Sequence, residues 1–372
     1  MFKRSRDTGR DSQESRIYYA SQSQLIWRKF VKHKLAVFSG LVILFMYLVV
    51  IFAEFVAPYN PNQRNTYYRY ARPQIIRFVS EDGFQFRPFV YGLEREMDPV
   101  TLRRSFHEDP SQVVPLQFFV RGHEYKLLGL IPTDRHLFGV EDDQVVYLFG
   151  SDDLGRCVFS RIVLGARISM TIGLVGVFLS FVLGLFFGGL SGYYGGIVDK
   201  VIGRIMEILR SFPQIPLWMA LSAALPDHWP IIRTYFAITL ILSVIGWTDL
   251  ARVARGKIYS LKNEDFVVAA RLAGTSEPRI ILEHLVPSFM SHIIAAITLA
   301  IPGMILAETS LSFLGIGLRP PAISWGVLLQ AAQNIHTIVL APWLMLPGVF
   351  VIIFVLAFNF LGDGLRNAAD PY

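Results

Sequence analysis

The stretch that decides the fold is DFVVAARLAGTSEPRIILEHLVP, Asp265 to Pro287, a polar segment between two long apolar ones. Apolar residues recur in it at intervals of three and four, which predicts a helix with one apolar stripe. The residues of this stripe are Phe266, Ala269, Ala270 and Ala273. Gly274 then allows the chain to turn into a second short helix. A stripe of alanines lets another surface approach closely, so we interpret this segment as a docking element; the alternative is an ordinary loop between membrane helices.

The spacing from Ala269-Ala270 through Gly274 to Pro287 resembles the "EAA" coupling loop of ABC importer permeases. One departure is Val268, which stands where many members of that family carry glutamate. The branch of the family that moves peptides often has an apolar or basic residue at this position. Val268 therefore favours that branch over the others.

Two further stretches resemble that branch, the dipeptide/oligopeptide/nickel permeases. GSDDLGRCVFSRIVLGARISM, Gly150 to Met170, is similar to its (G)TDxxGRDxxSRxxxGAR motif, with Cys157 in place of the usual aspartate. AETSLSFLGIG, Ala307 to Gly317, resembles its fifth-helix signature. The resemblance covers roughly residues 21–57 and 150–372 and leaves the middle of the chain unexplained.

The composition independently indicates a membrane protein. Hydrophobic residues make up 53% of the chain, charged residues 17%, and the mean hydropathy is +0.43. An apolar stretch of about 20 residues spans the hydrocarbon core of a bilayer, which is roughly 30 Å thick. Six spans are predicted near Leu35–Ala53, Thr171–Ser191, Glu207–Leu225, Pro230–Ala251, Ser291–Gly315 and Pro342–Leu361. We therefore expect an all-α integral membrane protein with six transmembrane helices, and the resemblance implies the type I ABC importer permease fold.

The distribution of lysine and arginine predicts the orientation. These residues are frequent before the first span and in the loop that holds the quoted stretch, and rare in the short loops on the other side. With six spans, both termini and the docking element face the cytosol. The net charge of +6 follows from this topology and does not call for nucleic acid. The resemblance implies a multi-pass protein of a bacterial or archaeal cytoplasmic (inner) membrane.

Four segments are predicted along the chain. Residues 1–34 are a cytosolic segment, in which residues 1–20 are expected to be disordered and 21–34 to form an amphipathic helix on the membrane lipid; a basic flank is the simpler alternative. Residues 35–57 form the first transmembrane helix, 58–149 an extracytoplasmic insertion, and 150–372 a five-helix core with a cytosolic coupling loop at 252–287.

The insertion between helices 1 and 2 is predicted to be small and β-rich. Dipeptides of turn type, Asp82-Gly83 and Gly122-His123, separate strand-like runs, and Asp98–His107 is expected to be a short helix. The strand-like runs are Gln74–Val79, Phe84–Tyr91, Val113–Arg121 and Glu124–Leu130. The insertion is either a module that meets a delivering protein or covers the pore mouth, or a spacer over the helix ends.

Catalytic and metal-binding patterns are missing from the sequence. It contains no GxxxxGK[ST] phosphate loop, and its histidines lack the spacing of metal ligands. We therefore expect a non-enzyme subunit without catalytic residues, metal or cofactor. Glu308 and Ser312 lie in the fifth apolar run, where an ionisable side chain faces the bundle interior or water. Glu308 is either a residue of the pore or gate, or a structural carboxylate.

A polar cluster precedes the second span on the outer side. Its residues are Asp152, Asp153, Gly155, Arg156, Ser160 and Arg161. The spacing of Asp153 and Arg156 predicts an ion pair on a short interfacial helix. Contact with substrate and a structural role at the membrane face are both open.

The resemblance also implies partners. They are a second, homologous permease, two ABC ATPase subunits that bind ATP and Mg, and an extracytoplasmic substrate-binding protein. The residues expected to contact an ATPase are Asp265, Phe266, Ala269, Ala270, Arg271, Gly274, Glu277 and Pro287. The cargo is a peptide, opine, oligosaccharide, antibiotic or nickel. The rival interpretations are a secondary transporter or channel that acts without ATPases, and a membrane-bound enzyme.

Overall fold

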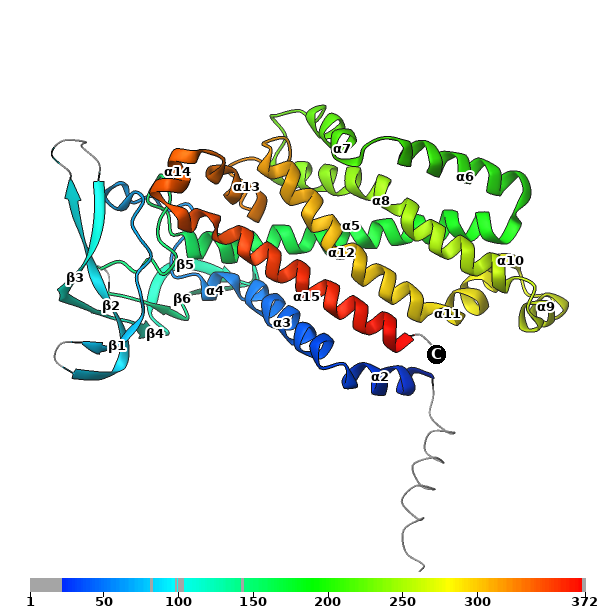
Figure 1. The fold of residues 1–372 in the computed structure, drawn as a ribbon, viewed down its shortest axis with the longest axis horizontal. Coiled ribbons are helices and arrows are strands. Elements are labelled where there is room, and N and C mark those ends of the chain that lie inside the picture. The colour runs from blue at the N-terminus through cyan, green and yellow to red at the C-terminus, as the bar shows by residue number, and fades with distance from the viewer. Residues whose placement is uncertain (1–21, 81–82, 98, 100–103, 142–143, 370–372) are drawn as a thin grey trace, which may run out of the picture.

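Five helices long and apolar enough to cross a membrane form the body of the molecule (Figure 1). The computed structural model describes residues 22–80, 83–97, 99, 104–141 and 144–369. The five are α3 (Lys34–Ile51), α5 (Val158–Tyr194), α8 (Ile231–Leu261), α12 (Met290–Phe313) and Pro342–Ala368, which comprises η4 (Pro342–Met345) and most of α15 (Leu346–Ala369). They correspond to five of the six expected spans.

Close helix packing builds the core of the bundle. The main contacts join α5 to α8, α12 to α15, and α15 to α3. Glycines on α5 make the first of these possible, because a side chain at Gly188 would lie 2.5 Å from the carbonyl oxygen of Ala251. The short helices are α2 (Gln22–Lys32), α4 (Ala53–Val56), η1 (Thr66–Tyr68), α6 (Gly196–Ser211), α7 (Gln214–Ala223), α9 (Asp265–Leu272), α10 (Glu277–Arg279), α11 (Val286–Ser288), α13 (Trp325–Gln330), η3 (Ala331–Gln333), α14 (Ile335–Leu340) and a π-helical stretch, η2 (Ile280–Leu285).

The expected third span, Glu207–Leu225, is not one helix. The chain breaks between α6 and α7 at Phe212-Pro213, so neither helix is long enough to be counted as a span. Proline cannot donate a helical hydrogen bond, and it disfavours helical backbone in the residue before it. Hydropathy predicted one apolar span here, and Pro213 divides it into two helices.

The expected fourth span is longer than predicted. Helix α8 continues past Ala251 to Leu261, so the first part of the expected coupling loop, which began at residue 252, is helical. Because a helix can continue beyond the membrane with polar residues on its surface, hydropathy alone underestimated its length. The non-helical connection starts at Lys262, and we call Lys262–Pro287 the coupling segment.

The N-terminal part that the structure describes begins with the amphipathic helix α2. Phe30 is buried in a cluster with Ala36 and Ala368, whereas Trp27 and Val31 are exposed. Lys32 continues the polar face, and a short break at His33 joins α2 to α3. The predicted helix is confirmed; the disorder expected for residues 1–20 lies outside the described residues.

Strands gather at the opposite end of the bundle from α9 (Figure 1). The strands are β1 (Arg77–Ser80), β2 (Gly83–Met97), β3 (Arg104–Pro115), β4 (Gln117–Phe118), β5 (Arg121–Leu127), β6 (Ile131–Arg135) and β7 (Phe138–Gly139). They form an antiparallel sheet in the order β1-β2-β3 and two antiparallel pairs, β4-β7 and β5-β6. The segment between α4 and α5 therefore contains strands, as predicted, although the expected run Val113–Arg121 is divided among β3, β4 and β5, and β6 and β7 were not predicted.

Two local predictions in this region are wrong. Gly122-His123 lies inside β5 and is not a turn; the turn comes later, at Leu128 and Gly129, which both have positive φ. Gly122 is required for packing instead, because a Cβ there would lie 2.7 Å from the His136 ring. Of the helix expected at Asp98–His107, residues 104–107 belong to β3, and 98 and 100–103 lie outside the described residues. Of the expected Asp82-Gly83 turn, only Gly83 is described, at the start of β2.

His136 connects the strands to the membrane helices. Its buried ring lies with Nδ1 3.1 Å from the carbonyl oxygen of Glu54 in α4 and Nε2 3.1 Å from that of His123 in β5. The Glu54 carboxylate in turn accepts a 2.7 Å hydrogen bond from Nη2 of Arg167 in α5. The position of the strands is therefore coupled to α4 and to the N-terminal part of α5.

Acidic pH is expected to loosen this connection. Burial and the neighbouring His136 lower the pKa of His123 to about 4 from 6.5. Between these two values the unfolded chain binds a proton that the folded chain does not, so stability is lost as the pH falls from 6.5 towards 4. Hydrogen exchange of β5 and β6, corrected for the intrinsic exchange rate at each pH, should show lower protection at pH 5 than at pH 7.5. His123→Asn should remove the difference and His107→Asn, at an exposed position of β3, should keep it; equal protection at both pH values in the unmodified chain would contradict this expectation.

Candidate functional site

The coupling segment protrudes from the end of the bundle that also holds α2 and the C-terminus (Figure 1). Helix α9 starts after Glu264, which is its N-cap without a side-chain hydrogen bond. The helix ends in a Schellman motif. Gly274 has φ +78°, its N–H donates to the Arg271 carbonyl (3.0 Å), and the Thr275 N–H donates to the Ala270 carbonyl (3.1 Å). The predicted turn at Gly274 is confirmed.

The two faces of α9 differ from the expected stripe. Ala270 points inward, where it is buried with Val267 in a cluster that includes Ile280 and Leu285. Phe266, Ala269 and Ala273 are exposed, and Leu272 is 84% exposed. Ala270 is therefore a core residue of the segment. A periodicity of 3.6 cannot tell which of two adjacent apolar stripes faces the protein, and here Val267 and Ala270 take that side.

Side chains at the end of α5 hold the segment in place. The Tyr194 hydroxyl donates to the Glu277 carboxylate (2.7 Å), and the Arg271 guanidinium lies over the Tyr193 ring (5.9 Å to its centroid). One turn further, Asp199 of α6 forms an ion pair with Arg255 of α8 (2.6 Å). Glu277 and Arg271, both predicted site residues, thus act on this chain's own tyrosines. The sequence analysis missed Tyr193 and Tyr194, although the sequence YYGG at the end of an uncharged run marks a helix end.

The second half of the coupling segment consists of three consecutive helical stretches. Ser276 is the N-cap of α10, with Glu277 and Pro278 in the first turn as their types predict. A π-helical stretch, η2, then leads to Pro287 in α11. Pro287 therefore lies in the connection between the coupling segment and α12 and is not part of the exposed face of α9.

Replacing Gly274 by alanine should strain the turn. A Cβ meets no atom within 4 Å there, so the cost arises from the positive φ alone, roughly 1–2 kcal/mol. We expect faster proteolysis of the coupling segment in Gly274→Ala. Gly256→Ala is the matched control, because Gly256 lies inside α8 with equally open surroundings. Equal proteolysis of both variants would show that the turn tolerates a side chain.

Glu308 is the centre of a buried polar cluster. Its side chain accepts hydrogen bonds from Ser324 (2.8 Å) and Ser312 (2.9 Å) at Oε1 and from Ser169 (3.2 Å) at Oε2. These hydroxyls also accept backbone N–H groups: Trp325 donates to Ser169, Leu318 to Ser312 and Val327 to Ser324. Helices α5, α12 and α13 are thereby tied together.

This geometry favours the structural alternative for Glu308. Residues of a pore or gate need a surface that a solute reaches, and Glu308 and Ser312 are both 0% exposed in this chain. The carboxyl oxygens are satisfied by hydroxyl donors, as a buried polar group requires. Ser169 and Ser324 were not among the predicted site residues; they come from distant parts of the sequence, so no spacing could indicate them.

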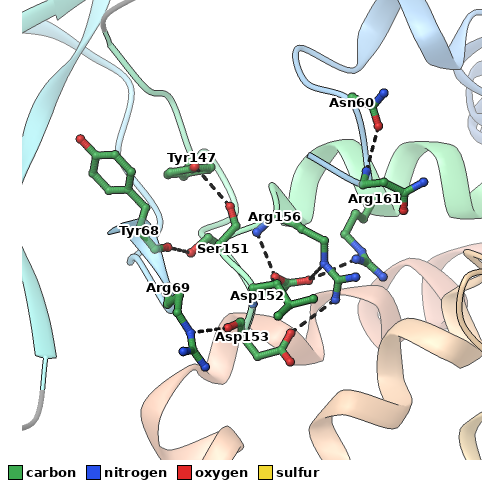
Figure 2. Close-up of polar contacts among 12 residues, drawn as sticks. Asn60, Tyr68, Arg69, Tyr147, Ser151, Asp152, Asp153, Arg156 and Arg161 are labelled. Atoms are coloured by element: carbon green, nitrogen blue, oxygen red, sulfur yellow. Dashed lines mark hydrogen bonds and ion pairs between the residues drawn. The ribbon is translucent and has the colours of Figure 1, made fainter. Parts of the chain in front are cut away.

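The outer polar cluster is assembled around Asp152 (Figure 2). Its Oδ1 accepts the N–H groups of Leu154 and Arg156 (both 2.9 Å), and its Oδ2 accepts Nε of Arg156 (2.7 Å). Nη1 of Arg161 lies 3.3 Å from the same Oδ2. The predicted pair of Asp153 and Arg156 exists at 3.4 Å, but on a turn that Gly155 closes with φ +73°, not on a helix.

Ser160 has a separate role from the arginines. It lies in the first turn of α5 together with Arg161, and its hydroxyl accepts the N–H of Tyr59 (3.2 Å). It therefore fixes the chain that leaves α4 against the start of α5. The six predicted residues of the outer cluster do lie together. Ser160 makes the contact with Tyr59, the two aspartates and two arginines form ion pairs, and Gly155 closes the turn.

Comparison with known proteins places the chain among transport components. The family described as "Binding-protein-dependent transport system inner membrane component" matches residues 180–372, and "N-terminal TM domain of oligopeptide transport permease C" matches residues 21–73. The chain is similar to the oligopeptide transport system permease protein OppC of Bacillus subtilis (37% identity over 224 residues; 60% of this chain, 71% of that protein). It is also similar to the dipeptide transport system permease protein DppC of B. subtilis (40% over 225 residues; 60% and 68%).

The chain is also similar to a third relative and to a solved structure. OppC of Escherichia coli K12 is 39% identical over 226 residues, which cover 60% of this chain and 72% of that protein. A chain of the inward-facing MetNI methionine ABC transporter aligns with 56% of this chain and 96% of its own, at 21% identity and a TM-score of 0.42.

Proposed function

Because the chain belongs to the binding-protein-dependent transport system inner membrane component family, we propose that it forms half of the translocation pathway of an ATP-driven peptide importer. It is a permease subunit and not an enzyme. The second half is a homologous permease, and two ATPase subunits, which bind ATP and Mg, supply the energy. An extracytoplasmic substrate-binding protein delivers a peptide or similar oligomeric solute. Relatives named as oligopeptide and dipeptide permeases support this choice of cargo.

The exposed apolar face of α9 is the observation that supports docking of this helix on an ATPase subunit. The exposed apolar residues of this face are Phe266, Ala269, Leu272 and Ala273, whereas Val267 and Ala270 on the other face of the helix are buried. A groove on an ATPase can take such a helix. Since Gly274 and the tyrosines of α5 fix its direction, movement of the ATPases is passed to α12 as a rigid body.

The arrangement of the two ends supports the proposed orientation. Helix α2, the C-terminus and α9 lie at one end, and the strands lie at the other (Figure 1). Basic residues are concentrated towards the first end, in particular on α2 and at Arg252, Arg255 and Lys257 in the C-terminal part of α8. We place that end, with both termini, in the cytosol of a bacterium or archaeon and the β-rich insertion outside. Helices α6 and α7 together then cross the membrane as the sixth, broken span.

Helix α2 lies on the inner membrane surface in this proposal. Trp27 and Val31 are exposed and continue into the exposed apolar residues Leu35 and Phe38 of α3. An apolar surface that runs from a basic amphipathic helix into a spanning helix is suited to contact lipid throughout.

Co-purification from the native membrane tests the proposed function. The tagged chain is extracted in mild detergent, and the proteins that remain bound are identified by mass spectrometry. We expect a second permease and nucleotide-binding subunits, and we expect the nucleotide-binding subunits to be lost from a Leu272→Asp variant. Recovery of a homo-oligomer alone, with no ATPase at any detergent strength, would favour a secondary transporter or channel.

A further inference from the structure

The turn between β5 and β6 is apolar and exposed. It has the sequence LLGLI, residues 127–131, in which Leu128, Leu130 and Ile131 are 53%, 81% and 59% exposed. Surface turns usually consist of Gly, Pro, Asn, Asp and Ser. Strands β5 and β6 form a two-stranded sheet, and a hairpin of this kind is marginally stable in water. Exposed apolar side chains that gather at such a turn are typical of an interaction surface.

The base of this hairpin lies at the boundary of the membrane. Residues 35–53, in α3 and the start of α4, carry no charge and span about 28 Å, close to the roughly 30 Å of a hydrocarbon core. Glu54, which ends this run, and Arg167, with which it pairs, therefore mark the boundary. His136 follows β6 directly, and its Nδ1 lies 3.1 Å from the carbonyl oxygen of Glu54.

The hairpin belongs to a longer ribbon that runs along α4. Phe119 donates its N–H to the carbonyl of Leu137 (3.0 Å), and His136 donates its N–H to the carbonyl of Val120 (2.8 Å). These two hydrogen bonds join the pair β4-β7 to the pair β5-β6, so the four strands form one continuous antiparallel ribbon.

This ribbon points toward the membrane. Phe138 packs on Phe159 in the first turn of α5 (ring centroids 5.5 Å apart), about two helical turns outside the boundary. The preceding residue, Leu137, donates its N–H to the carbonyl of Phe55 (2.7 Å), and His136 lies at the boundary itself. Strands β5 and β6 continue from there, and they lie beside α4 (Figure 1).

The exposed surface of α3 continues into the ribbon. Leu48, Ile51 and Phe52, at the end of α3 that adjoins α4, are exposed. Phe119 of the ribbon is also exposed, and its ring centroid lies 6.0 Å from that of Phe55 in α4. Aromatic side chains are frequent where a membrane meets water. The lipid around α3 is therefore the apolar surface that borders the hairpin.

We propose that the turn of residues 127–131 inserts into the lipid leaflet beside α4 and anchors the β-rich segment on the membrane. In the proposed orientation this is the outer leaflet. The apolar side chains of the turn enter the leaflet, and the exposed Lys126 next to them stays at the level of the lipid phosphates. The ligand is phospholipid, because the ribbon leaves α4 on the side of the membrane.

A fluorescent probe on the turn tests the proposal. Cys157 is the only cysteine of the chain and is buried, so Leu130→Cys can be labelled selectively with an environment-sensitive fluorophore. The full chain is placed in phospholipid nanodiscs with and without nitroxide groups on the acyl chains. We expect the nitroxide lipids to quench most of the emission at position 130. Phe86→Cys is the control, because Phe86 is 92% exposed in the three-stranded sheet and should not be quenched.

The replaced side chains are exposed, so neither variant removes a buried contact, and Leu128→Cys repeats the measurement on the same turn. Emission at position 130 that nitroxide lipids leave unchanged would overturn the proposal. Equal quenching at positions 86 and 130 would also overturn it, because the fluorophore itself would then enter the lipid. A probe at position 130 that is shielded only after a substrate-binding protein or a second permease is added would assign the turn to a protein partner instead.

Discussion

Replacing Leu272 by aspartate is expected to abolish transport and ATPase association while the chain stays folded. Leu272 is 84% exposed on α9, so the substitution removes almost no contact within the chain. If an ATPase groove covers this face, the new carboxylate must lose its water without a partner, which costs several kcal/mol. The measurements are uptake of a labelled tripeptide by cells that carry the variant, and recovery of the ATPases with the purified chain.

A leucine of the same exposure provides the control. Leu130, in the turn between β5 and β6 at the other end of the molecule, is 81% exposed. Leu130→Asp should leave ATPase association intact. If Leu272→Asp retains the ATPases and full uptake, α9 is not the docking element.

Ala270 would be a poor choice for the same experiment. It is 8% exposed and packs with Val267 and Ile280 in the cluster beneath α9. A charge there destabilises the segment itself, so loss of the ATPase would have two explanations.

Replacing Glu308 by leucine is expected to destabilise the bundle by about 3 kcal/mol or more. The substitution leaves the hydroxyls of Ser169, Ser312 and Ser324 without their common acceptor, and each unpaired buried polar group costs about 1–3 kcal/mol. Helical serines can turn to a carbonyl of their own helix, which recovers part of this loss. The half-life of the folded chain in detergent at raised temperature measures the effect.

Two further variants complete this experiment. Glu283→Leu is the control, because Glu283 is exposed in an ion pair with Arg279, and such pairs contribute about 1 kcal/mol or less. Glu308→Gln retains an acceptor oxygen and should be less destabilised than Glu308→Leu. A Glu308→Gln chain that is as stable as the original but transports nothing would favour the pore or gate interpretation over the structural one.

The sequence predicted local features correctly where the backbone conformation requires one particular type of residue. The turn at Gly274 needs φ +78°, which favours glycine strongly, and the preceding helix has the expected period. Long uncharged runs predicted five spans for a similar reason, because only a helix satisfies its own backbone hydrogen bonds in a lipid core. The failure at Pro213 concerned a single residue within an otherwise suitable run.

The arrangement of side chains was less accessible. Ala269 and Ala270 are adjacent and identical in type, yet the first is exposed and the second buried. Gly122 had the appearance of a turn residue, but its small size serves the packing of His136. In both cases the deciding contact comes from a segment distant in sequence.

The sequence by itself determined a multi-pass helical membrane protein with a regular, glycine-ended helix between its fourth and fifth expected spans, because hydropathy, period and turn chemistry are local properties. Only the tertiary structure decided that Ser169 and Ser324 donate hydrogen bonds to Glu308, and that Tyr194 donates one to Glu277. Those contacts join residues from separate helices. They depend on how the helices pack, and no local pattern encodes which side chain will face which neighbour.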